Sequence, residues 1–476
     1  MKDDNRFAAL LSCYVERSRA SKNELIRLCG INRSSFFQFL AGKRAPSPEQ
    51  LDHIIAFLQL PSKDEQELRT QFQRMEVGEQ TWQNRRSIFN CLRTLAGADH
   101  FNEYEPLAAQ TLLAPSASCL ACTGSDSVFR QLQHFLQAAF SAPQPRLDFF
   151  MPSQNSSFFE ELKALYREKR DSAPHIRQLI QFPTGKDLLN CSILEDFNNI
   201  LFFLTSGRSG YQAYYYYDTA CLSNSLGVPY PYYVFSPEGL VLIDAGFSHS
   251  IAVQNPTLLA TTKDSFERAL AQSRNIVCRF ADTGAAFGLL EKAPGATTCA
   301  ASLCVSSLAT DYLIDTYAPA PLQPMFYEHC HAMQSIHPSV EFCSLSCLAR
   351  FAETGKLDDL TGRIIAPVKP EDRAHILESL LPRLNESLYF IDEASVPLSR
   401  EWTIALYGSE RLLIFRNGLH NLELIDVAEK NIVDAFVDYF ASLPGTPAVL
   451  PRERAAEVIR QLTGPAKQRF QGPPLL

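Results

Sequence analysis

The sequence predicts a multidomain chain in which a small all-α domain is followed by a large α/β (α+β) region. Two observations predict this fold class. Residues 5–76 contain five runs with apolar residues at helical spacing and three candidate capping boxes. After residue 146, short apolar runs typical of strands alternate with amphipathic runs typical of helices. The chain has 476 residues, of which 46% are hydrophobic, so it is long enough for several cores.

The change of pattern along the chain predicts four parts. We assign a five-helix domain to 1–76, a mostly helical connector to 77–145, a first α/β lobe to 146–300 and a second to 301–476. No apolar run approaches the ~20 residues of a membrane helix, and the N-terminus lacks the basic-then-apolar pattern of a signal peptide. We therefore expect a cytoplasmic protein that does not enter a membrane. The 13 cysteines, an odd number, fit reduced thiols better than a disulfide framework.

The first two helices have clear boundaries. The second is expected to open with the capping box Ser21–Glu24, to turn Leu25 and Leu28 inward, and to end at Gly30. The first has four apolar residues on one face: Phe7, Leu10, Leu11 and Tyr14.

The next three helices complete the bundle. The third starts after Asn32 as N-cap and ends before Gly42. The fourth starts at the capping box Ser47–Gln50, with Pro48 at its first position, and the fifth at Ser62–Glu65. The expected inward residues are Phe36, Phe39, Leu40, Leu51, Ile54, Ile55, Leu58, Leu68, Phe72 and Met75.

The second and third helices are separated only by Cys29–Asn32, which is helix-turn-helix spacing. Here the chain resembles the phage-repressor-like (Cro/repressor, XRE) helix-turn-helix family over residues 5–76. Three runs match that family in register: Ser21-Lys-Asn-Glu-Leu25, Gly30-Ile-Asn-Arg-Ser-Ser-Phe36 and Gly42-Lys-Arg-Ala-Pro46. Leu40 replaces the family's usual glutamate, and Phe37 replaces a small polar residue.

The resemblance implies a recognition helix that enters the major groove of double-stranded DNA. We expect Arg33, Ser34, Phe37 and Gln38 to read bases, since arginine pairs with guanine, glutamine with adenine, and an apolar ring packs on the thymine methyl. Phosphate contacts are expected from residues at helix starts and loops: Lys22, Asn32, Lys43 and Arg44. The alternative is that these charges are only a solvated face.

The charge distribution agrees with a nucleic-acid module at one end. Between Arg17 and Arg44 there are seven basic residues and one acid, so the net charge of −8 comprises +6 in these 28 residues and −14 in the other 448.

Repressors of this family usually dimerise on palindromic operators, and the connector could supply a homodimer interface. Packing of the connector against the next domain is an equally good interpretation.

The α/β region begins with a β-α-β pattern: strand Leu147–Met151, helix Ser156–Arg170 and strand His175–Phe182. Further elements follow, as strands Asn199–Thr205 and Gly210–Tyr217, hairpin strands Tyr232–Phe235 and Leu240–Asp244, helix Lys263–Ser273 and strand Asn275–Phe280. The later part predicts strand Ile364–Val368, helix Glu371–Leu384, strands Ser387–Ile391, Leu412–Phe415 and Leu422–Asp426, and helix Ile432–Leu443.

The hairpin around Val234–Asp244 compares with the one around Ile414–Asp426, which suggests an internal repeat of two similar lobes. Chance similarity of two amphipathic hairpins is the alternative. The arrangement is similar to regulators whose effector domain is a degenerate, phospholipase-D-like pair of lobes, although this chain has no His-x-Lys motif.

Signatures of catalysis and of cofactor binding are missing from the sequence. It has no phosphate-binding loop, no nucleophile elbow, no His-Glu-x-x-His and no dinucleotide fingerprint, so we expect no enzyme and no cofactor. Cys119 and Cys122 form a lone Cys-x-x-Cys pair. A looser group of His329, Cys330, His331, His337, Cys343 and Cys347 has ligand-like spacing, but buried cysteines are common in cores. We expect neither to be a metal site.

Eight tyrosines lie between residues 211 and 233. On a strand, Tyr214 and Tyr216 share one face and Tyr215 and Tyr217 the other, so one pair is expected to line a core and one a surface or cavity. Tyr214, Tyr216 and Tyr232 are candidates for a ligand pocket, because phenols combine apolar area with a hydrogen-bonding tip. Ordinary sheet packing is the alternative.

Taken together, the patterns predict a sequence-specific DNA-binding transcriptional regulator whose C-terminal region senses an unknown small-molecule or protein effector. Two alternatives are a DNA-anchored protein-interaction module and a cryptic enzyme fused to an autoregulatory helix-turn-helix.

Overall fold

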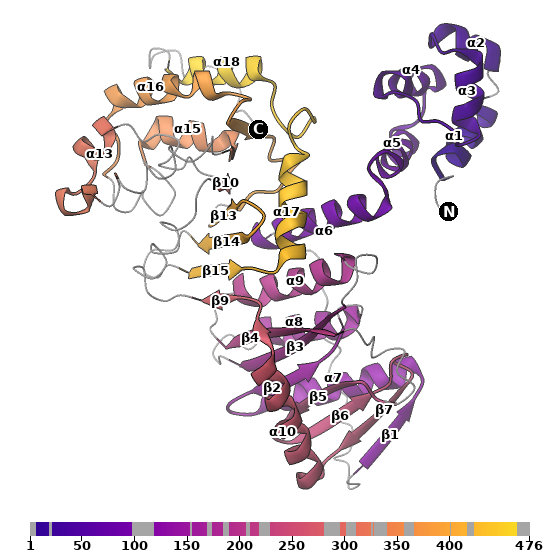
Figure 1. The fold of residues 1–476 in the computed structure, drawn as a ribbon, viewed down its shortest axis with the longest axis vertical. Coiled ribbons are helices and arrows are strands. Elements are labelled where there is room, and N and C mark those ends of the chain that lie inside the picture. The colour runs from indigo at the N-terminus through magenta and orange to yellow at the C-terminus, as the bar shows by residue number, and fades with distance from the viewer. Residues whose placement is uncertain are drawn as a thin grey trace. The chain divides into compact units, whose positions relative to one another are not determined.

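The computed structural model forms two compact units, Met1–Arg86 and Ser87–Leu476 (Figure 1). The residues that the structure describes are 6–18, 21–97, 119–152, 155–168, 174–183, 190–205, 210–218, 229–279, 296–300, 311–324, 327, 340–356, 366–399, 401–416 and 423–463.

The first unit is all-helical and has its own core. A sixth helix, α6 (Glu79–Leu95), begins in this unit and continues into the second. The core is built mainly from phenylalanine, leucine and isoleucine side chains at the positions that the helical spacing predicts. The five helices of the bundle are α1 (Arg6–Arg17), α2 (Lys22–Leu28), α3 (Arg33–Leu40), α4 (Pro48–Leu58) and α5 (Ser62–Val77).

Only one of the three predicted capping boxes is present. Ser47 Oγ accepts from the Gln50 amide at 3.2 Å, and Gln50 Oε1 accepts from the Ser47 amide at 3.0 Å. Ser21 is the N-cap of α2 but its side chain makes no capping bond. Ser62 is already inside α5, whose N-cap is Pro61. The predictions at Ser21 and Ser62 were therefore wrong, because the pattern predicts where a helix starts but not whether the serine rotamer closes the box.

The prediction that Leu28 turns inward was also wrong. Leu28 is 60% exposed, whereas Leu25 and Cys29 are buried. On a helix of seven residues, positions four apart share a face, so Cys29 takes the inward position one turn after Leu25. Leu40, predicted to be buried, is half-buried.

We expect Ser47→Ala to lower the free energy of unfolding of the first unit by about 1 kcal/mol, because the Gln50 amide at the start of α4 loses its partner. Ser21→Ala is the matched control, since it removes an N-cap serine that makes no capping bond. Urea denaturation followed by circular dichroism measures both. Equal losses in the two variants would contradict this reading of the caps.

The first lobe of the second unit is built on an eight-stranded sheet of order β1-β7-β6-β5-β2-β3-β4-β8. β2, β3 and β4 are parallel, and all the other pairs are antiparallel. The strands are β1 (Cys119–Thr123), β2 (Arg146–Phe150), β3 (His175–Pro183), β4 (Tyr211–Asp218), β5 (Tyr232–Ser236), β6 (Gly239–Ile243), β7 (His249–Val253) and β8 (Arg274–Asn275). The helices are α7 (Ser125–Ser141), α8 (Ser156–Glu168), α9 (Asn190–Thr205) and α10 (Pro256–Gln272).

The second lobe is built on a seven-stranded sheet of order β12-β11-β10-β13-β14-β15-β9. Its strands are β9 (Cys278–Arg279), β10 (Ala296–Ala300), β11 (Glu341–Ser344), β12 (Leu388–Ile391), β13 (Trp402–Tyr407), β14 (Arg411–Arg416) and β15 (Glu423–Val427). Its helices are α13 (Asp311–Tyr317), α15 (Leu345–Thr354), α16 (Pro370–Ser379), α17 (Lys430–Ala441) and α18 (Arg452–Thr463), with short 3-10 turns at Ala320–Leu322 and Leu381–Arg383.

The two sheets have the same topology, which supports the internal repeat. The order β1-β7-β6-β5-β2-β3-β4 corresponds strand for strand to β9-β15-β14-β13-β10-β11-β12, with the same parallel and antiparallel pairs. The hairpins compared in the sequence are not equivalent, however. By strand order, β5–β6 corresponds to β13–β14 and not to β14–β15. The sequence comparison therefore placed the second hairpin one strand too late. β9 and β10 belong to the second sheet although they lie before residue 301.

Three further sequence predictions need correction. Asn199–Thr205, predicted as a strand, lies in α9, because a short run that is apolar all round does not distinguish a buried helix from a strand. The predicted helical connector contains the edge strand β1, whose five residues are mostly exposed and too few for the sequence to show an alternating pattern. Residues 366–368 of the predicted strand Ile364–Val368 have no regular secondary structure, and the first two residues lie outside the described part.

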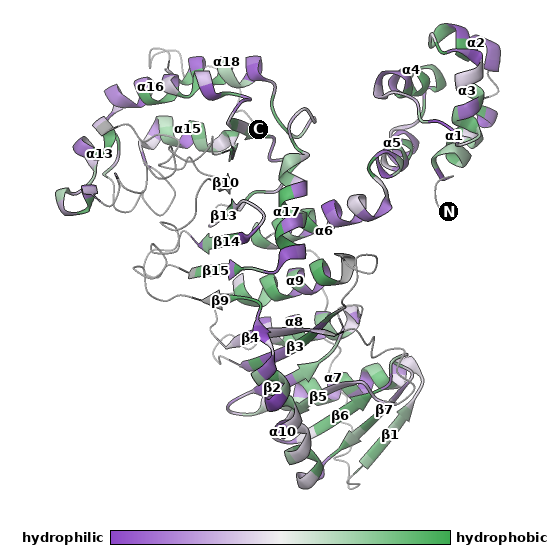
Figure 2. Cartoon of the chain, viewed as in Figure 1, coloured by the Kyte–Doolittle hydropathy of each residue, from purple (hydrophilic) through white to green (hydrophobic). Residues whose placement is uncertain are grey.

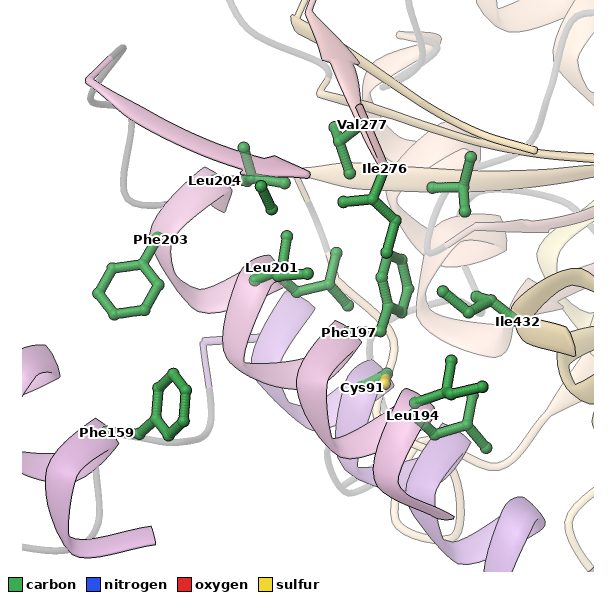
Figure 3. Close-up of a cluster of buried hydrophobic side chains, with 14 of the residues drawn as sticks. Cys91, Phe159, Leu194, Phe197, Leu201, Phe203, Leu204, Ile276, Val277 and Ile432 are labelled. Atoms are coloured by element: carbon green, nitrogen blue, oxygen red, sulfur yellow. The ribbon is translucent and has the colours of Figure 1, made fainter. Parts of the chain in front are cut away.

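The core of the second unit joins both lobes through α6, α9 and α17. The rings of Phe197 on α9 and Phe436 on α17 are 6.1 Å apart in an edge-to-face contact. Figure 3 shows Cys91 of α6 and Ile432 of α17 around Phe197. Figure 2 shows that β6 is predominantly hydrophobic, whereas β4, which carries the run of tyrosines, is more hydrophilic.

Candidate nucleic-acid interface

Two glycine turns position α3 in the first unit. Gly30 and Gly42 have φ of 64° and 67°, the left-handed conformation that side chains with a Cβ rarely adopt. After α2, the Ile31 amide donates to the Ile26 carbonyl at 3.1 Å. After α3, the Lys43 amide donates to the Gln38 carbonyl at 2.9 Å. Each is the six-to-one bond of a Schellman motif, so the sequence itself ends both helices sharply.

The start of α3 is capped by Asn32. Its Oδ1 accepts from the Ser34 amide at 2.9 Å and from the Ser34 hydroxyl at 2.8 Å. The capping oxygen is therefore occupied, while the carboxamide NH2 of Asn32 is left to contact a phosphate. The Ser34 hydroxyl keeps its lone pairs for a donor on a base edge.

The outer face of α3 presents the four residues predicted to read bases. Arg33, Ser34, Phe37 and Gln38 are all exposed, as two pairs spaced four residues apart, and Phe37 is 43% exposed. The Arg33 guanidinium lies 6.0 Å from the centre of the Phe37 ring. Phe36 and Phe39 on the opposite face are buried and fix the helix on the bundle. The helix thus offers an arginine fork, an amide and an aromatic ring on one surface.

The cations predicted to contact phosphate lie at helix ends and in the following loop. Lys22, Lys43 and Arg44 are exposed, and none forms an ion pair with another residue in the described part of the chain. The Arg44 guanidinium reaches the Ser35 hydroxyl at 3.5 Å.

The sequence pattern did not identify the exposed Leu28 on α2 as a surface residue. The available signal was Cys29, which is buried and lies four residues after the buried Leu25.

The three tyrosines predicted for a ligand pocket pack together on the first sheet. Tyr214 and Tyr216 lie on one face of β4, and Tyr232 lies on β5. All three are half-buried against an apolar cluster that includes Phe150 and Phe266. The rings of Tyr216 and Tyr232 are 6.5 and 5.9 Å from that of Phe150. The pocket itself stays a prediction.

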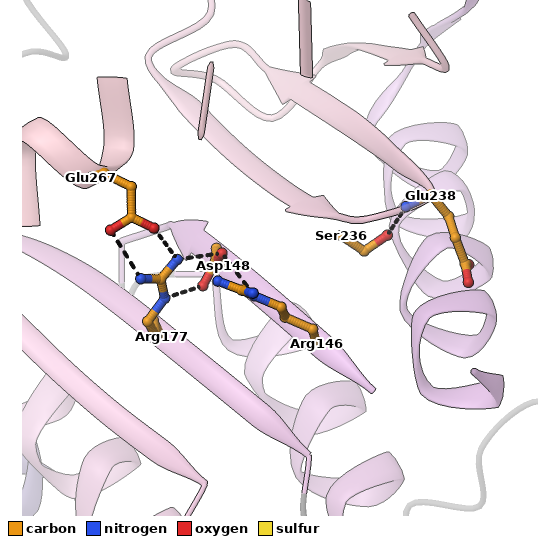
Figure 4. A network of polar contacts seen from close by, with 6 residues as sticks. All are labelled: Arg146, Asp148, Arg177, Ser236, Glu238 and Glu267. Atoms are coloured by element: carbon orange, nitrogen blue, oxygen red, sulfur yellow. Dashed lines mark hydrogen bonds and ion pairs between the residues drawn. The ribbon is translucent and has the colours of Figure 1, made fainter. Parts of the chain in front are cut away.

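A buried ion-pair network lies on the same sheet (Figure 4). The Arg177 guanidinium donates to both Asp148 oxygens, at 2.6 and 2.8 Å, and to both Glu267 oxygens, at 3.1 and 2.8 Å. Asp148 is 2% and Arg177 8% exposed. The hydrogen bonds that Arg177 donates to Asp148 raise the pKa of Arg177, and those that it donates to Glu267 lower the pKa of Glu267. A cavity of about 240 Å³ borders Asp148, Arg146 and Lys263.

The structure describes only part of the candidate metal ligands. Among the described residues, no group of three His, Cys, Asp or Glu side chains could hold a metal ion. Cys119 is exposed on β1 with Cys122 half-buried, and Cys343 and Cys347 are buried. His329, Cys330, His331 and His337 lie outside the described residues.

Comparisons with known proteins give little similarity. No protein-family model matches the chain, and no curated protein matches it. Among solved structures it is similar to TrmBL2, an archaeal chromatin protein whose structure is described as showing a novel mode of DNA binding. That match covers 54% of this chain and 100% of TrmBL2, at 10% identity and a TM-score of 0.24. Overlap of this quality does not establish a shared fold.

None of the helices in the described part of the chain is both long and apolar enough to cross a membrane.

Proposed function

We propose that this chain is a sequence-specific DNA-binding transcriptional regulator of the phage-repressor-like type, with α3 as the recognition helix. The observation that supports this most is the exposed row Arg33, Ser34, Phe37 and Gln38, which lies on a helix held by two Schellman turns and a buried apolar face. A helix of this kind fits the major groove of B-form DNA.

Each side chain has a role that its chemistry suits. Arg33 binds a guanine through two hydrogen bonds, Gln38 an adenine, and the exposed Phe37 ring packs on a thymine methyl group. Ser34 completes the base contacts. The residues at the ends of the helices fix the register on the phosphates without reading sequence: Lys22, Asn32, Lys43 and Arg44.

The second unit, in this proposal, senses an effector without catalysing a reaction, and the protein acts in the cytoplasm as a homodimer on a palindromic operator. The sequence lacks signatures of catalysis, and the duplicated lobes share one core with α6, the helix that continues from the first unit. A protein effector in place of a small molecule would show as a partner that co-purifies with the chain. Turnover by the full chain would favour the cryptic enzyme.

We expect DNA affinity to depend strongly on salt through Lys22, Lys43 and Arg44. Replacing all three by glutamine should reduce the slope of log K against log salt by about 2.7, because each lost phosphate contact removes roughly 0.9. Fluorescence anisotropy with a mixed-sequence duplex measures the slope. The matched control neutralises three exposed cations of the second unit, Arg268, Lys356 and Arg460. An unchanged slope in the first variant would contradict the phosphate contacts.

A further inference from the structure

A single glycine separates the last helix of the bundle from the helix that continues into the second unit. α5 ends at Val77 and α6 begins at Glu79, so only Gly78 interrupts a helix from Ser62 to Leu95. Gly78 has φ of 84° and ψ of 146°, a conformation that residues with a Cβ rarely adopt. A Cβ added here would meet no described atom within 4 Å, so it is the backbone conformation alone that requires glycine.

Arg74 on α5 reaches across this joint to α6. Its guanidinium lies 3.8 Å from the centre of the Trp82 ring, and its Nε lies 3.8 Å from a carboxylate oxygen of Glu79. The Arg74 side chain is largely covered, and its Nε is buried without a hydrogen bond to any described residue. The ring and the carboxylate are therefore the groups that hold this cation in place. All of these residues lie inside the first unit.

The contacts of Arg74 depend on the bend at Gly78. Arg74 and Trp82 are eight positions apart in the sequence, which is about 12 Å along the axis of a continuous helix. Arg74 and Glu79 are five positions apart, whereas side chains that meet on a helix are three or four apart. Arg86 differs, because it lies four residues after Trp82 within α6 and 5.5 Å from the same ring, a contact that a straight helix keeps.

The sequence around the joint favours a helix once the bend is released. Residues 73–77 and 79–83 contain no proline and no glycine, and one glycine inside a helix disfavours it only about fivefold relative to alanine. Trp82 is the first residue of α6 whose amide reaches a carbonyl four residues back, that of Gly78 at 3.0 Å. The amides of residues 79–81 come before it and have no helical acceptor. A continuous helix would give these three amides acceptors, at the expense of the contacts of Arg74.

We propose that Gly78 is a two-state joint through which the second unit regulates the recognition helix, with a bent form held by Arg74 and a straight form in which α5 and α6 are one helix. The inference rests on the proposed function and names how it is regulated. α5 belongs to the core of the first unit through Phe72, whereas α6 enters the core of the second through Ile88. A change at Gly78 therefore redirects α6 as it leaves the bundle, and in a homodimer it changes the spacing of the two α3 helices.

Hydrogen exchange of the full chain without DNA, read by mass spectrometry over residues 76–82, tests the joint. Gly78→Ala strains the bent form and favours the helix, so the amides of residues 79–81 should exchange at least about fivefold more slowly than in the unchanged protein. Arg74→Gln removes the contacts of the bend without altering the backbone and should slow the same amides. Arg86→Gln is the matched control and should leave them unchanged, since its contact with Trp82 lies within α6.

Unchanged exchange of the buried core of α1–α4 shows that each variant is folded. Exchange at residues 79–81 that is as fast in Gly78→Ala as in the unchanged protein would overturn the joint. Equal effects of Arg74→Gln and Arg86→Gln would overturn the role of Arg74 in holding the bend.

The regulatory role is tested on DNA with Gly78→Ala. The variant should change the affinity for a palindromic operator at least about fivefold and leave the affinity for a half-site unchanged, because only the spacing of the two α3 helices differs. Equal affinity of the variant and the unchanged protein for the palindrome would overturn this role. Absence of DNA binding by the unchanged protein would instead count against the proposed function, while the exchange measurements still decide the joint.

Discussion

Replacement of Asp148 by alanine is expected to lower the free energy of unfolding of the second unit by about 3–5 kcal/mol. Arg177 is buried on β3 and donates hydrogen bonds to both oxygens of Asp148 on β2, so the variant leaves a buried guanidinium without its nearest counter-charge. Glu267 compensates in part, but its side chain is 45% exposed and its interaction is screened by solvent. Urea denaturation of the full chain, followed by tyrosine and tryptophan fluorescence, measures the loss.

Two comparisons make this prediction specific. The double variant Asp148→Leu with Arg177→Met should recover much of the loss, because no charge is left buried. Glu267→Gln should cost much less than Asp148→Ala. Since bonding to Arg177 lowers the pKa of Glu267, the contribution of Glu267 is present above its ordinary pKa and is lost as the pH falls below it. A loss for Asp148→Ala no larger than that for Glu267→Gln would show that the buried pair is not important for stability.

Replacement of Arg33 by alanine is expected to reduce affinity for the specific operator by about 1–3 kcal/mol, roughly five- to 150-fold, and to relax the sequence preference at one base pair. Arg33 is the exposed arginine at the first turn of α3, where a recognition helix enters the groove. The operator is first selected from a random duplex pool, and both proteins are then titrated against it and against single-base variants.

Arg17→Ala is the control for Arg33→Ala. Arg17 is an exposed arginine of the same basic segment, but it lies 3.9 Å from Asp64 and at the end of α1. Its loss should change affinity little and equally for all sequences. If Arg33→Ala retained full affinity and the same base preference, α3 would not be the reading element.

The bundle and its surface could be predicted from the sequence because their signals are local. Gly30 and Gly42 end helices through their own backbone conformation, and Asn32 caps α3 within two residues. Once these boundaries are set, helical geometry alone places Arg33 and Phe37 on one face. Leu28 was missed because spacings of three and of four residues both fit one helical face, and after Leu25 the buried position is Cys29 and not Leu28.

The larger unit was predicted less completely for the opposite reason. Residues 199–205 are apolar on every side, so only the packing of α9 between α6 and α17 decides that they are helical. The sequence comparison paired two hairpins that are not equivalent, and only the strand order gives the correspondence between the two lobes.

The sequence by itself thus determined the composition of the outer face of α3, since helix caps, glycine turns and exposed side chains are fixed by neighbours a few residues apart. The tertiary structure decided the ion-pair network. Arg177 meets Asp148 and Glu267 across long stretches of chain. Such groups are brought together by the burial of apolar surface on the two sheets, and no local pattern records which of them will meet.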